Sequence, residues 1–64
     1  MKKKDLISLA KKIASEELKI RKSTDKKEIN DAQNKIIKLS SQITNQEDLF
    51  LLDELIQELI ASNS

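Results

Sequence analysis

The sequence predicts an all-α protein: a small three-helix bundle made of a helical hairpin and a third helix. Apolar residues recur at helical spacing in three separate stretches, and no stretch alternates cleanly enough to predict a strand. The chain has no Gly or Pro, so it lacks the Gly-based turns that join two strands in a tight hairpin. Its 64 residues have room for one domain, which we place at 1–64.

The first helix is expected at about residues 5–22. Leu6, Ile13 and Ile20 repeat every seven residues, and this spacing is typical of coiled coil-like packing between helices. Residues 1–4 contain three consecutive lysines, whose charges oppose the positive N-terminal end of a helix dipole. We therefore expect 1–4 to form a basic, frayed arm.

The second helix is expected at about residues 26–43, and the third at about 46–61. Asp25 and Glu28 have the spacing of a capping box at the start of the second helix. Thr44 and Glu47 have the same spacing at the start of the third. A continuous helix through this second junction also fits the sequence, because neither Gly nor Pro interrupts it.

Charge is divided unevenly along the chain, although its net value is only +1. Residues 1–38 carry all twelve Lys and Arg and six acids, a net charge of +6. Residues 39–64 carry five acids and no base, a net charge of −5. Two interpretations fit this division: the basic and acidic helices pack side by side, or one of them faces an oppositely charged partner.

The apolar faces differ in width when each helix is projected at about 100° per residue. The second helix has a narrow apolar stripe, whereas the stripes of the first and third helices spread over about 180°. Helices 1 and 3 therefore have more apolar surface than helix 2 can cover. This predicts a bundle completed by homodimerisation, with a well-packed monomer as the alternative.

Two features interrupt the apolar pattern, and each has two interpretations. Glu17 and Arg21 project into the apolar arc of the first helix, either as a solvent-exposed i, i+4 pair or as a polar device that receives a partner. Phe50 projects to the polar side of the third helix, among acids. It either folds back toward Ile43 or forms an exposed aromatic anchor for a partner.

The preferred function is a non-enzymatic protein–protein interaction module, an adaptor or inhibitor that docks on a larger protein through its helix faces. Charged groups would orient the contact and apolar groups would supply its area. The candidate partner-binding residues come from the first and third helices: Ile7, Leu18, Phe50, Leu51, Asp53, Glu54, Leu55 and Gln57.

The alternative function is that of a small protein associated with RNA or DNA through its basic N-terminal helix. The absence of Trp and Tyr and the presence of a single Arg weaken this alternative, because few groups remain for base stacking or base-edge recognition. Its candidate residues are Lys2, Lys3, Lys4, Lys11, Lys12, Lys19, Arg21 and Lys22.

Composition argues against catalysis. Without His or Cys, the usual nucleophile–base pairs and metal ligands are missing, so we expect no catalytic residue, no cofactor and no metal. No run of apolar residues approaches the length needed to span a bilayer, and the apolar run after Lys2–Lys4 is too short for a signal peptide. The sequence therefore predicts a cytoplasmic protein that does not bind a membrane.

Overall fold

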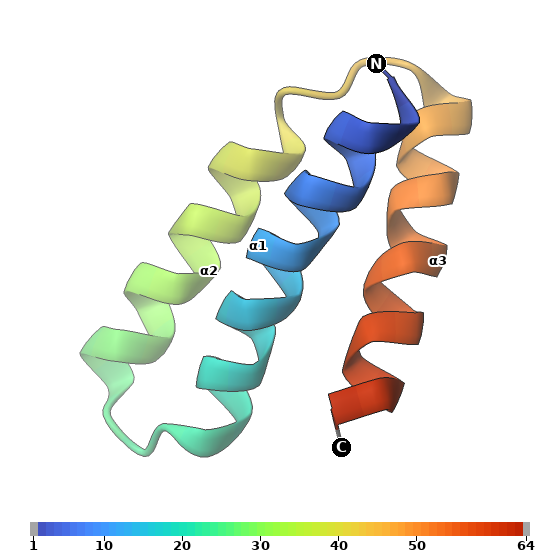
Figure 1. Ribbon diagram of the computed structural model, residues 1–64. Coiled ribbons are helices and arrows are strands. Elements are labelled where there is room, and N and C mark those ends of the chain that lie inside the picture. Colours follow the sequence, from blue (N-terminus) through green and yellow to red (C-terminus); the bar gives the residue numbers. More distant parts are fainter. Residues whose placement is uncertain (1, 64) are drawn as a thin grey trace.

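The computed structural model describes residues 2–63, and the side chains of residues 2–62. Three helices make up this part of the chain: α1 (Lys3–Lys22), α2 (Lys26–Ser40) and α3 (Gln46–Asn63). Helix α1 packs against both α2 and α3, whereas α2 and α3 contact each other much less. Figure 1 shows α1 running between its two neighbours, parallel to α3 and antiparallel to α2. The all-α class and the small three-helix bundle are thus confirmed.

The start of α1 differs from the expectation. Lys3 and Lys4 lie inside the helix rather than in a frayed arm, and Met1 lies outside the described residues. The backbone N–H of Leu6 donates to the carbonyl of Lys2 at 3.0 Å, which requires the intervening residues to be helical. Leu6 is only 2% exposed, so burial of this side chain holds the first turn in place despite the unfavourable lysine charges.

The turn between α1 and α2 is built from side-chain hydrogen bonds instead of Gly. Asp25 is the N-cap of α2, as predicted, and its Oδ1 accepts from the backbone N–H of Lys27 at 3.0 Å. Glu28 does not reach back to Asp25, as a simple capping box would require. Its Oε2 accepts from the Ser23 hydroxyl at 2.8 Å, and Ser23 Oγ accepts from the N–H of Asp25 at 3.2 Å. Ser23 thus bridges Asp25 and Glu28, the two residues of the expected capping box.

Helix α2 ends at Ser40, three residues before the expected end. The hydroxyls of Ser40 and Ser41 donate to the carbonyls of Ile37 and Lys38, at 3.1 and 2.7 Å, and so compete with further helical hydrogen bonds. Ile43 leaves the helix but remains buried, at 7% exposed. The seven-residue repeat therefore predicted correctly that Ile43 is buried, but the prediction that Ile43 is helical was wrong.

Asn45, and not Thr44, is the N-cap of α3. The side-chain Oδ1 of Asn45 accepts from the N–H of Glu47 at 2.9 Å, and its carbonyl accepts from the N–H of Leu49 at 3.1 Å. Both bonds are those of an N-cap residue. Residues 41–45 separate α2 from α3, so the two helices are not continuous.

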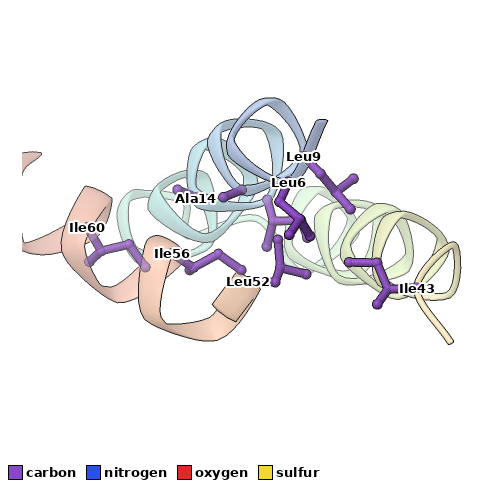
Figure 2. Close-up of a cluster of buried hydrophobic side chains, with 9 residues drawn as sticks. Leu6, Leu9, Ala14, Ile43, Leu52, Ile56 and Ile60 are labelled. Atoms are coloured by element: carbon purple, nitrogen blue, oxygen red, sulfur yellow. The ribbon is translucent and has the colours of Figure 1, made fainter. Parts of the chain in front are cut away.

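One apolar cluster holds the three helices together (Figure 2). Helix α1 supplies five of its buried members, the segment after α2 supplies one and α3 supplies three: Leu6, Leu9, Ala10, Ile13, Ala14, Ile43, Leu52, Ile56 and Ile60. Because α1 has a neighbour on either side, most of its wide apolar arc is covered within one chain. The expected surplus of apolar surface thus lies mainly on α3, where Leu49, Phe50 and Leu51 are exposed.

The arrangement is open for a protein of this mass. Its accessible surface is 5006 Å², against about 4,200 Å² for a compact monomer of 7.3 kDa. Its Cα radius of gyration is 11.8 Å, against about 10.7 Å for a compact chain of the same length. The weak contact between α2 and α3 accounts for this expansion, because only the α1–α2 and α1–α3 pairs pack closely.

Candidate interaction surfaces

The outward side of α3 presents the only aromatic residue of the chain. Phe50 is 71% exposed, so the interpretation in which it folds back toward Ile43 is wrong. Leu52, Ile56 and Ile60 turn one side of α3 toward the core. Phe50 lies two residues before Leu52, about 200° away around the helix axis, and must therefore face solvent.

Polar and acidic side chains surround Phe50 on the same side of α3. Gln57 lies seven residues after Phe50, and Asp53 and Glu54 lie three and four residues after it, at the spacings that bring side chains together on a helix. All three are exposed. We call Phe50, Asp53, Glu54 and Gln57 the Phe50 face.

A second surface lies between α1 and α3. A groove of about 410 Å³ is lined by residues of both helices: Lys3, Leu6, Asp48, Leu51, Glu54, Leu55 and Glu58. Leu51 is 49% exposed and Leu55 is half-buried against the core. We call this surface the α1–α3 groove, and its floor is apolar while its charged side chains are mostly acidic.

Ile7 lies beside this groove, whereas Leu18 lines the groove between the end of α1 and the start of α2. Ile7 follows Lys3 by four residues, so it falls along the same stripe of the helix as this groove-lining lysine. Both apolar side chains are half-buried. The predicted partner-binding residues thus divide among three places. Leu51 and Leu55 line the α1–α3 groove with Ile7 beside it, and Leu18 lines the groove between α1 and α2. The others form the Phe50 face, and Glu54 lies at the edge between that face and the α1–α3 groove.

The exposed lysines on the outer side of α1 lie next to the same groove. Lys4 and Lys11 are seven residues apart on one stripe, immediately beside Ile7 and Leu18 in helical projection. On the other side of the groove, Glu54 and Glu58 are both exposed. The groove therefore has a basic edge on α1 and an acidic edge on α3.

The structure does not collect the eight candidate nucleic-acid residues on one surface. All eight are exposed, but they point in different directions. Lys3 lines the α1–α3 groove near the start of α1, whereas Arg21 lines a groove near the end of α1 together with Glu17, Ile20, Gln33 and Ile36. Arg21 and Glu17 thus lie beside α2, near the end of α1.

Acidic side chains interrupt a groove of the basic hairpin. This groove, of about 750 Å³, lies between the end of α1 and the start of α2 and is lined by Lys19, Lys22 and Lys35, but also by Glu16, Glu28 and Asp31. Glu16 lies 3.6 Å from the Lys19 ammonium and 3.9 Å from that of Lys35. This hairpin surface is consequently of mixed charge and not continuously basic.

The described residues contain no group of three or more His, Cys, Asp and Glu side chains placed to hold a metal ion. Within the same part of the chain, no helix has the length and apolar character needed to cross a bilayer. Comparison of the chain with protein-family models, with curated proteins and with solved structures found no match.

Proposed function

We propose that this protein is a non-enzymatic, cytoplasmic helical interaction module that acts as a homodimer and docks on a larger protein through the Phe50 face. The observation that carries the proposal is the 71% exposure of Phe50. A large aromatic side chain contributes little to stability when it faces solvent, whereas aromatic residues are enriched at the centres of protein–protein interfaces.

The charge of α3 indicates the chemistry of the partner. Asp53 and Glu54 flank Phe50, and the described part of α3 contains no Lys or Arg. A partner surface with an apolar pocket rimmed by Lys or Arg would bury Phe50 while its charges meet these acids. Charge complementarity of this kind speeds association and orients the partner more than it adds affinity.

A capture experiment tests this proposal. Purified protein is immobilised and exposed to lysate of its source cell, with and without nuclease, using the wild-type chain, Phe50→Ala and Ile37→Ala. Ile37 is a matched control because it is a large apolar residue, 63% exposed, on a different helix. We expect one nuclease-resistant protein to bind wild type and Ile37→Ala in stoichiometric amount, and at least tenfold less of it to bind Phe50→Ala, about 1.4 kcal/mol.

The result that would overturn the proposal is equal capture by wild type and Phe50→Ala. Loss of all captured material after nuclease treatment would instead favour association with RNA or DNA. The observation behind that second candidate is the row of exposed lysines on the outer side of α1, and it predicts binding that weakens steeply with salt.

A further inference from the structure

We infer that the α1–α3 groove is the homodimer interface, and that a second copy of the chain covers it in parallel, so that α1 of each copy lies on α3 of the other. The inference rests on the homodimer included in the proposed function. It identifies the surface, the symmetry and the charged pairs of that dimer, and it leaves Phe50, Asp53 and Gln57 free for the larger partner.

The first argument is the order of side chains across the groove. In helical projection Lys4, Lys11 and Ile7 follow one another around α1 toward the groove. The groove lining then continues through Leu51 to the acidic edge with Glu58. An apolar centre between charged edges is the usual arrangement of an association surface between helices. Here the two edges have opposite charge, so the surface can complement a copy of itself.

The second argument is symmetry. Two copies related by a two-fold axis bury the same surface on each side. If the axis runs along the groove, parallel to the helices, the basic edge of each copy meets the acidic edge of the other. If the axis crosses the groove at right angles, α1 meets α1 and α3 meets α3, so like charges face each other. The charge pattern therefore selects the parallel dimer.

The third argument is that the charged residues of α1 and α3 lie at the same level along the helix axes. Lys3 and Leu6 line the same groove as Leu51, Glu54 and Glu58, so the start of α1 lies level with the first and middle turns of α3. Rotation about an axis parallel to the helices preserves height. Lys4 and Lys11 of one copy are thus brought opposite Glu54 and Glu58 of the other, within reach of these long side chains.

The area available is sufficient for a modest dimer. Helix α1 has 20 residues and α3 has 18, so the paired helices present a face about 30 Å long and about 20 Å wide. Two such faces bury on the order of 1,200 Å², at the lower end of specific interfaces.

Charge-reversal variants test the inference by sedimentation equilibrium from about 10 μM to about 1 mM, a range that covers a weak dimer. The acidic variant combines Lys4→Glu and Lys11→Glu, and the basic variant combines Glu54→Lys and Glu58→Lys. We expect wild type to reach twice the 7.3 kDa monomer mass. Each variant alone should dimerise at least about tenfold more weakly, since four attractive pairs become repulsive.

Mixing the two variants is the decisive measurement. In the parallel dimer, every contact in the mixed pair joins a Lys to a Glu, so an equimolar mixture should recover a dimer near wild-type affinity. Lys12→Glu combined with Lys38→Glu is the matched control, because it changes net charge as the acidic variant does but places the change outside the groove. Circular dichroism of each variant checks that its helices have formed.

The outcomes separate this inference from the proposed function. Wild type that stays monomeric to about 1 mM would overturn both the dimer and its interface. A wild-type dimer unaffected by the acidic and basic variants, or weakened equally by the Lys12→Glu and Lys38→Glu control, would overturn the interface alone. Phe50→Ala should remain as dimeric as wild type, and loss of its dimer would show that the Phe50 face, and not the groove, joins the copies.

Discussion

Ile13→Ala is the substitution that best tests the central position of α1. Ile13 is 1% exposed and lies midway along the only helix that packs on both others. The substitution removes three carbon atoms, worth about 0.8 kcal/mol each in transfer free energy. The cavity left behind raises the cost, and the better helix propensity of Ala returns a few tenths of a kcal/mol. We expect the free energy of unfolding to fall by about 2–4 kcal/mol.

A loss of this size is large compared with the total free energy of unfolding of the chain. A chain of 64 residues has a free energy of unfolding of roughly 3–10 kcal/mol, and in domains of this size each kcal/mol shifts the melting temperature by about 4–8 °C. The melting temperature of Ile13→Ala should therefore fall by at least about 10 °C. Thermal and urea unfolding followed by far-ultraviolet circular dichroism measure both quantities, at one low protein concentration because dimerisation would add stability.

Ile37→Ala is the control for this experiment. Its side chain is 63% exposed on α2, so its removal should change the free energy of unfolding by no more than about 0.5 kcal/mol. If Ile13→Ala and Ile37→Ala are equally stable, or if Ile13→Ala costs less than about 1 kcal/mol, then α1 does not occupy the centre of the fold and the packing argument fails.

Two further substitutions test local features of the structure. Phe50→Ala should leave the melting temperature within about 4 °C of wild type, because its side chain is mostly exposed; a fall of 10 °C or more, of about the size expected for Ile13→Ala, would place it in the core. Asn45→Ala should destabilise the fold by about 1 kcal/mol in urea unfolding through loss of the α3 cap, whereas Thr44→Ala should cost less than half of that. Equal effects at Asn45 and Thr44 would show that the cap is shared between them.

The sequence was sufficient for features that depend on neighbouring residues. The all-α class and the Asp25 N-cap follow from apolar spacing and from hydrogen bonds within a few residues, both of which are visible in the chain itself. The two separate charge regions are likewise a property of composition along the chain. These features were predicted correctly because no distant contact is needed to produce them.

The features that were predicted wrongly depend on where distant residues lie. The first turn of α1 forms because Leu6 is buried, and α2 ends early while Ile43 still reaches the core. The cap of α3 is an exception, a local feature that was also predicted wrongly, because Thr44 and Asn45 can both cap a helix and the spacing does not choose between them. A periodicity can identify a core residue, but it cannot say whether its backbone stays helical.

Tertiary structure alone decided which apolar surface remains uncovered. A wide apolar arc can be buried either by a second chain or by two neighbours within one chain, and sequence spacing does not distinguish the two cases. Here α1 lies between α2 and α3, which covers most of its arc and leaves Leu51 and Phe50 exposed on α3. The sequence by itself determined three helices and two regions of opposite charge, whereas packing determined the side-by-side placement of α1 and α3 that gives one groove both a basic and an acidic edge.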